Sequence, residues 1–127
     1  MGTIIHFDLS ADDLQRAKHF YEEMFGWKFE QFPGGPQAYY LIDTSPGSTE
    51  KGLTGGMAKR EKEGQKIINF IQVEAIDESI AKLEKLGGKV IEPKAYIPTV
   101  GFIAGCEDTE RNAIGLIELE KNENAVP

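Results

Sequence analysis

The sequence predicts an α+β fold built from two tandem βαβββ modules, and three observations support this prediction. Short segments rich in β-branched and aromatic residues alternate between apolar and polar positions, as strands do. Two longer segments carry apolar residues at helical spacing. The order of these segments is the same in both halves of the chain. Because 127 residues is the usual length of one domain, we expect a single domain over residues 1–127, with module one at about 3–58, a charged linker at 59–65 and module two at about 66–120.

The two halves of the chain form an internal repeat. One constant offset aligns them, and the same frame holds through a helix, a strand and a hairpin. Few aligned residues are identical, but agreement over three successive elements indicates a repeated structural unit. The aligned pairs are Leu14 and Ile76, Tyr21 and Leu83, Met24 and Leu86, Gly26 and Gly88, Phe29 and Ile91, Tyr40 and Phe102, and Leu41 and Ile103.

The first half predicts one helix and four strands. Residues 3–10 alternate and should form a strand, after which Ser10 or Asp12 can cap a helix. Apolar residues recur at helical spacing from Leu14 to Phe25, and Gly26 follows where a helix commonly ends. Turn signals at PGGP (33–36) and TSPGSTEKG (44–52) separate three further strand candidates. These candidates are 27–32, 37–43 and 52–58.

The second half predicts the same order of elements. A strand at 66–74 precedes a helix at 77–86, which should stop at Gly87 and Gly88. Three later strands are expected near 89–93, 100–106 and 112–120.

Composition and charge limit the possible functions. Hydrophobic residues make up 40% and charged residues 28%, as in soluble globular proteins. No apolar run is long enough to span a membrane, the first residues lack a signal-peptide pattern, and the single Cys106 excludes an internal disulfide framework, so we expect a cytoplasmic protein. The net charge of −7 disfavours nucleic acid and anionic lipid as partners and favours cationic or neutral ligands. Glu61 and Glu63 interrupt the basic residues of segment 58–66, which we interpret as a solvated linker.

The segments 4–30, 76–93 and 102–118 together resemble the glyoxalase/bleomycin-resistance/dioxygenase family, the vicinal oxygen chelate superfamily. The most specific parts are the DLQRAKHFYEEMFGW helix, the LGGKV after the second helix and the DTERN turn before the last strand. The resemblance extends over about residues 4–119. It implies two modules whose sheets curve into an open half-barrel cavity that holds a small molecule, with the helices packed outside. It also implies a homodimer, because the family commonly completes its cavities by pairing subunits.

Strand alternation predicts which side chains reach this cavity. In the first strand, Phe7 and Leu9 suit the helix side, so His6 and Asp8 should face the cavity. The same frame in module two places Ile68, Phe70 and Gln72 toward the cavity, and Ile71 and Val73 beneath the second helix.

The resemblance also bears on metal binding. In metal-using members the ligands come from both modules, typically a histidine on each first strand and acidic residues on the late strands. His6 matches the first position, but its counterpart falls on Ile68, or on Asn69 if the frame slips by one. The late-strand positions fall on Gly55, Gly56 and Gly115, with Glu118 facing the opposite side. Because one histidine cannot supply three or four donors, we predict neither a metal nor another cofactor.

Three interpretations of His6 stay open: a metal ligand, a group that contacts a bound molecule, or a buried or rim histidine without a role. His6 and Asp8 share one face of the strand, with about 6–7 Å between their Cα atoms, near enough to hold one substrate group together. The pair could also perform acid/base chemistry. Alternatively, Asp8 is a hydrated residue at the cavity rim.

The remaining candidates are aromatic, sulfur-containing or at turns. Tyr39, Tyr40 and Phe102 are strand aromatics that either line the cavity or belong to the core. Met57 could close one end of the pocket. Cys106 has no base near it in sequence and is interpreted as a buried structural thiol. Arg111 stands in the DTERN turn where the family often has glycine, at a position where we expect a left-handed backbone, and we assign it no function.

Two functional hypotheses follow. The first is a metal-independent protein that binds a small organic molecule, with His6, Asp8, Tyr40, Met57, Phe70, Gln72 and Phe102 as the candidate contacts. The second is a lyase, isomerase or transferase of glyoxalase type, in which His6 and Asp8 act as acid and base or a metal binds in an arrangement the sequence does not reveal. The absence of a complete set of metal ligands favours the first hypothesis, small-molecule binding. The His6 and Asp8 pair is consistent with the second, because the two side chains could act as acid and base.

Overall fold

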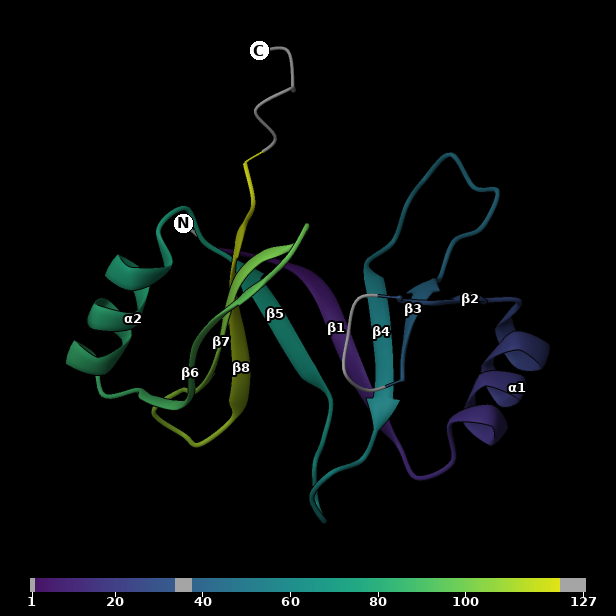
Figure 1. Ribbon diagram of the computed structural model, residues 1–127, viewed down its shortest axis with the longest axis horizontal. Coiled ribbons are helices and arrows are strands. Elements are labelled where there is room, and N and C mark those ends of the chain that lie inside the picture. The colour runs from purple at the N-terminus through teal and green to yellow at the C-terminus, as the bar shows by residue number, and fades with distance from the viewer. Residues whose placement is uncertain (1, 34–37, 122–127) are drawn as a thin grey trace. The chain divides into compact units, whose positions relative to one another are not determined.

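The computed structural model describes residues 2–33 and 38–121 and contains two helices and eight strands within these ranges (Figure 1). The chain divides into two compact units, the first comprising Ile5–Asn69 and the second Met1–Ile4 with Phe70–Pro127. Most of the predicted PGGP turn lies outside the described residues. The described part of the chain contains no helix that is both long and apolar enough to cross a membrane.

The first unit holds four strands and one helix. Its strands follow the order β2-β3-β4-β1, in which β1 runs parallel to β4 and the other neighbours are antiparallel. The bounds are β1 Thr3–Ala11, α1 Leu14–Phe25, β2 Lys28–Gln31, β3 Tyr39–Asp43 and β4 Thr54–Lys59. The elements follow the predicted order, and their bounds differ from the expected ones by a few residues at most.

The core of the first unit lies between the sheet and α1. Its buried residues are Ala11, Ile42 and Met57, and Phe7 and Leu9 pack against them. The alternation of β1 therefore points Phe7 and Leu9 toward the helix, as the sequence predicted. Burying these side chains fixes the strand register, because a slip of one residue would place His6 and Asp8 in the apolar core.

The ends of α1 differ in how well the sequence predicted them. Asp13, and neither Ser10 nor Asp12, caps the helix: its carboxylate accepts a hydrogen bond from the Arg16 backbone N–H at 3.0 Å. Gly26 ends the helix with a φ of 72°, a left-handed conformation that glycine adopts without strain.

The second unit repeats the arrangement in the strand order β5-β8-β7-β6, where β7 pairs antiparallel with both β6 and β8. The bounds are β5 Ile68–Gln72, α2 Ile76–Lys85, β6 Lys89–Ile97, β7 Gly101–Glu107 and β8 Ala113–Leu119. Its core is formed by Ile76, Ala104, Cys106 and Leu116, against which Ile71 and Val73 pack on the α2 side, as expected. The α+β class with two tandem βαβββ modules is thus confirmed.

Two polar contacts stabilise the ends of elements in the second unit. Glu118 lies on the α2 side of β8, as predicted, and its carboxylate accepts from the Ile76 backbone N–H at 2.8 Å. In the DTERN turn, Asp108 accepts hydrogen bonds from the Asn112 side-chain amide and from the backbone N–H groups of Asn112 and Glu110, and these hydrogen bonds lower the pKa of Asp108. Arg111 has a φ of 66°, so this position does have the left-handed backbone expected for it.

Candidate functional site

Four polar side chains gather on the face of the first unit's sheet that is opposite α1. The register pairs His6 with Thr54 and Asp8 with Gly56 across β1 and β4, and paired residues project to the same face. Tyr39 pairs with Ala58, two residues beyond Gly56, and therefore joins this face from β3. We name His6, Asp8, Tyr39 and Thr54 the His6 cluster.

Hydrogen bonds connect all four members of the His6 cluster. His6 Nδ1 lies 3.0 Å from Thr54 Oγ1, and His6 Nε2 lies 3.0 Å from the Tyr39 hydroxyl. The Tyr39 hydroxyl donates to Asp8 Oδ1 at 2.5 Å, and the same carboxylate oxygen lies 3.3 Å from His6 Nε2. Each side chain of the cluster therefore restricts the orientation of the next.

The hydrogen bonds of the Tyr39 hydroxyl indicate which nitrogen of His6 donates to it. Because the Tyr39 proton goes to Asp8, the Tyr39 oxygen accepts from His6, which assigns the proton of a neutral imidazole to Nε2. On the other side of the ring, Thr54 Oγ1 lies 3.0 Å from His6 Nδ1 and donates to the Ile5 carbonyl oxygen at 3.4 Å. Burial, followed by the charge of Asp8 and its hydrogen bond, raises the pKa of the Tyr39 phenol well above its ordinary value of 10.0. Tyr39 is thus a proton donor within the cluster and not a phenolate.

One acceptor of the cluster is open. Within the described part of the chain, no group donates to Asp8 Oδ2, and the side chain of Asp8 is 29% exposed. The His6 side chain is 19% exposed. A carboxylate oxygen that is accessible and not engaged by the protein can accept a hydrogen bond from an N–H or O–H group of a bound molecule.

Gly56 provides the space that the Tyr39 phenol occupies. A Cβ atom at position 56 would lie 1.6 Å from the Tyr39 hydroxyl oxygen and 2.6 Å from Asp8 Oδ1. Any larger residue would therefore displace Tyr39 from its contacts with His6 and Asp8. Gly56 thus supports the cluster sterically.

Tyr40 and Met57 lie on the opposite face of this sheet, contrary to the expectation that they line a cavity with His6. Met57 is fully buried in the core, and Tyr40 packs against that core from β3. The Tyr40 hydroxyl accepts from Gln15 Nε2 of α1 at 2.7 Å. The physical reason is the parity of β3: Ile42 is in the core, so Tyr40 points the same way and Tyr39 points to the His6 cluster.

The candidates of module two lie in the second unit and also divide between two faces. Phe102 packs against the core beneath α2, contrary to expectation, with Lys94 Nζ 4.9 Å from its ring centroid. Phe70 lies against Gly115, where an added Cβ would come within 2.3 Å of its ring. Gln72 is exposed. Phe70 and Gln72 alternate with Ile71, which packs beneath α2, so both point away from that helix.

The residues around His6 do not fit a metal centre. A divalent transition metal needs three or four donors, and the cluster offers one imidazole and one carboxylate beside two hydroxyl groups. Across the ranges that the structure describes, no three His, Cys, Asp or Glu side chains gather where they could hold a metal ion. The glycines at 55, 56 and 115 provide no donor side chain.

Cys106 is 2% exposed and lies in the core of the second unit. Burial raises the pKa of its thiol, and nearby Glu84 raises it further. A buried thiol with a raised pKa is a poor nucleophile, which agrees with the structural role inferred from the sequence.

Two members of the cluster were not identified as contacts from the sequence. Tyr39 was considered only together with Tyr40, and the alternation around Ile42 is the signal that could have separated them. Thr54 was not singled out, because its contact with His6 depends on the register between β1 and β4, which are far apart in the chain.

Comparison with known proteins places the chain in a family. The sequence model of the Glyoxalase/Bleomycin resistance protein/Dioxygenase superfamily matches residues 3–116, and the chain therefore belongs to this superfamily. A glyoxylase-like domain-containing protein from Didymella fabae is 31% identical over 119 residues, which cover 87% of this chain and 89% of that protein. A putative glyoxylase, CFP32, from Mycobacterium bovis is 29% identical over 95% of this chain, which spans only 47% of that relative.

Solved structures show the same fold at low sequence identity. Methylmalonyl-CoA epimerase from Mycobacterium tuberculosis superposes with a TM-score of 0.69 at 18% identity, covering 93% of this chain and 88% of the epimerase chain. A Streptomyces coelicolor methylmalonyl-CoA epimerase, in complex with 2-nitronate-propionyl-CoA, superposes with a TM-score of 0.67 at 15% identity, covering 93% of this chain and 97% of that chain.

Proposed function

We propose that this protein binds a small organic molecule at the His6 cluster, and that the molecule presents an N–H or cationic group to Asp8. The observation that supports this proposal is the hydrogen-bonded cluster with its open acceptor, Asp8 Oδ2. His6, Tyr39 and Thr54 already satisfy one another, so the donor that completes the cluster comes from outside it.

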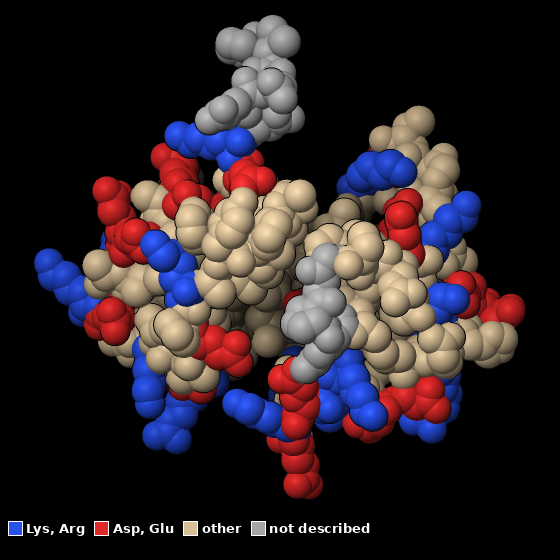
Figure 2. All heavy atoms as spheres, in the orientation of Figure 1, with Lys and Arg blue, Asp and Glu red and all other residues tan. Residues whose placement is uncertain are grey.

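Charge supports the same class of guest. The chain has a net charge of −7, and acidic and basic side chains are interspersed over the face drawn in Figure 2. A net negative protein attracts cations more than anions at long range. Phe70 and Gln72 belong to the second unit, and their predicted role as ligand contacts stays a prediction.

The alternative proposal is an isomerase, lyase or transferase that uses the His6 cluster for proton transfer. It is favoured by one observation: the imidazole is within hydrogen-bond distance of Tyr39 and 3.3 Å from Asp8. His6 would exchange the proton with the substrate, and Asp8 with Tyr39 would hold the ring. This alternative requires turnover, which simple binding does not.

A thermal-shift screen with small metabolites, antibiotics and divalent metal ions tests the proposal. Compounds that bind the folded state raise the melting temperature. We expect organic compounds with donor or cationic groups to do so in the wild type and to lose most of the effect in Asp8→Asn. Glu23→Gln on α1, which removes the same charge outside the cluster, is the matched control. Equal shifts in the wild type and Asp8→Asn for every stabilising compound would contradict the proposal.

We also propose that the site works without a metal, because of the donor count around His6. Elemental analysis of purified protein should find no stoichiometric zinc, nickel, iron or manganese. About one tightly bound transition metal per chain, lost in His6→Ala, would overturn this part of the proposal.

A further inference from the structure

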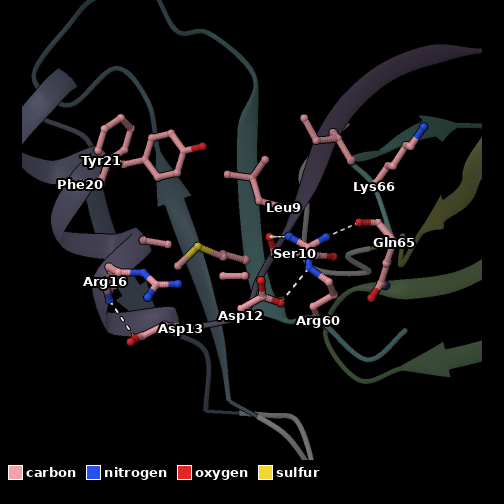
Figure 3. A pocket seen from close by; sticks show the side chains of 14 residues that line it. Leu9, Ser10, Asp12, Asp13, Arg16, Phe20, Tyr21, Arg60, Gln65 and Lys66 are labelled. Atoms are coloured by element: carbon pink, nitrogen blue, oxygen red, sulfur yellow. Dashed lines mark hydrogen bonds and ion pairs between the residues drawn. The ribbon is translucent and has the colours of Figure 1, made fainter. Parts of the chain in front are cut away.

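A second candidate site lies on the helix side of the first unit, away from the His6 cluster. It is an open pocket of about 930 Å³ beside the start of α1, and all of its lining residues belong to the first unit (Figure 3). Leu9 and Met57, which point to the side of the sheet opposite His6, are among them. The volume suits a small organic molecule.

Arg60 holds one wall of the pocket in place. Its guanidinium pairs with Asp12 at 3.0 Å and donates to the backbone carbonyls of Ser10, at 3.2 Å, and Gln65. The Arg60 backbone N–H donates to the Ala11 carbonyl at 2.8 Å. These hydrogen bonds hold the charged linker beside the end of β1, as Figure 3 shows. Arg60 therefore has a structural role, which the interpretation of this segment as a solvated linker did not include.

Exposed apolar side chains line the same pocket. Phe20 is 56% exposed and Ile67 is 58% exposed. Tyr21 lies beside Phe20 with a ring-centroid distance of 5.2 Å, so the α1 wall is aromatic. A guest with an apolar body would remove these side chains from water, which stabilises a complex in proportion to the area covered.

The charges around the pocket favour an anionic head group. Asp12 is paired with Arg60, and Asp13 is engaged as the cap of α1. Within the part of the chain that the structure describes, the side chains of Arg16 and Lys66 form no ion pair. The Arg16 guanidinium points toward the middle of the pocket in Figure 3. An unpaired guanidinium beside an aromatic wall suits a carboxylate attached to an apolar ring.

We propose that this pocket binds a small organic anion with an apolar body, whose carboxylate pairs with Arg16 and whose body covers Phe20 and Ile67. The proposal is independent of the function proposed for the His6 cluster, since the two sites lie on opposite faces of one sheet and take guests of opposite charge.

Titration of the full chain with 2-naphthoate, followed by amide NMR signals, tests the proposal. We expect saturable shifts centred on Leu9, Ala17 and Ile67. Arg16→Gln should weaken the affinity for 2-naphthoate about fivefold or more, because a charge-assisted pair is lost while the helix propensity is nearly kept. The neutral 2-naphthamide should bind more weakly than 2-naphthoate and should be insensitive to Arg16→Gln.

Two control variants separate this site from general charge effects and from the His6 cluster. Lys18→Gln removes the same charge from the same helix outside the pocket and should leave the affinity for 2-naphthoate unchanged. Asp8→Asn should also leave it unchanged. The proposal is overturned by an absence of saturable shifts, by equal binding of 2-naphthamide, by no effect of Arg16→Gln, or by equal effects of Arg16→Gln and Lys18→Gln.

Discussion

The phenol of Tyr39 stays protonated to higher pH in the folded chain than in the unfolded one. Burial is the main cause, and the neighbouring Asp8 carboxylate adds to it both by its charge and by accepting the phenol's hydrogen bond. A raised pKa means that the folded state retains a proton that the unfolded state loses above about pH 10. The stabilisation from Tyr39 is therefore fully present below that pH and decreases as the pH rises further.

This linkage gives a prediction for Tyr39→Phe. The free energy of unfolding of the wild type should decrease above about pH 10, and Tyr39 should contribute at most about 1.4 kcal/mol per pH unit to this decrease. The free energy of unfolding of the variant should decrease less steeply over the same pH range. Urea unfolding at several pH values measures both slopes, and their difference removes the contribution of the other tyrosines. Parallel slopes would show that Tyr39 titrates normally.

The alternation of β1 gives a second prediction. Phe7→Asp or Leu9→Asp should cost several kcal/mol and unfold the chain, because each places a carboxylate against the buried cluster beneath α1. Asp8→Asn and His6→Gln should change stability by less than about 1.5 kcal/mol, since both positions are partly exposed and the new side chains still form hydrogen bonds. Circular dichroism during urea unfolding measures these differences. A large loss in Asp8→Asn combined with a small one in Phe7→Asp would reverse the assignment of the two faces.

For single residues, the sequence predicted the orientation of side chains correctly where apolar and polar residues alternate along a strand. Phe7 and Leu9 mark the buried side of β1, so the orientation of His6 and Asp8 followed from them. In β3 two adjacent tyrosines offered no such distinction, and Tyr40, which was the predicted ligand contact, packs on the helix side. Only the burial of Ile42 decides between them.

The start of α1 depends on Asp13, which gives a prediction for that helix. Asp13→Ala should lower the free energy of unfolding by about 1 kcal/mol, because the Arg16 backbone N–H loses its acceptor. Ser10→Ala is the control, since Ser10 precedes the helix and does not cap it. Equal losses in the two variants, measured by urea unfolding, would argue against Asp13 as the cap.

The two helices illustrate which element boundaries sequence can predict. Gly26 and Gly87 marked the helix ends correctly, because a positive φ favours glycine locally. The cap of α2 could not be predicted in the same way: its first backbone N–H binds Glu118, which comes from a strand 42 residues further along the chain. Contacts of this kind depend on tertiary packing and leave no local pattern.

For the whole molecule, the proposed homodimer is a separate prediction. Met24 and Phe25 on α1 are 64% and 55% exposed, and apolar surface of this kind is often covered by a second subunit. Light scattering at micromolar concentration should give twice the 14.1 kDa mass of one chain. A monomer mass with intact circular dichroism would exclude a stable dimer under these conditions.

The repeat was sufficient to predict the whole order of elements, because two βαβββ units with one hydrophobic frame restrict the possible folds strongly. The same frame also paired Tyr40 with Phe102 correctly, since each packs on the helix side of its own unit. The repeat could not identify a ligand, because it reflects how the apolar residues of each module pack and contains no information on ligands.

NMR mapping of a compound selected by the thermal-shift screen tests the proposed site most directly. If the His6 cluster is the binding site, the largest shifts will fall on His6, Asp8, Tyr39 and Thr54. The Asp8→Asn and His6→Gln variants will then bind the compound about 1–3 kcal/mol more weakly than the wild type. Shifts centred elsewhere, with an affinity that is the same in the wild type and both variants, would show that His6 is a structural histidine with no contact to the ligand.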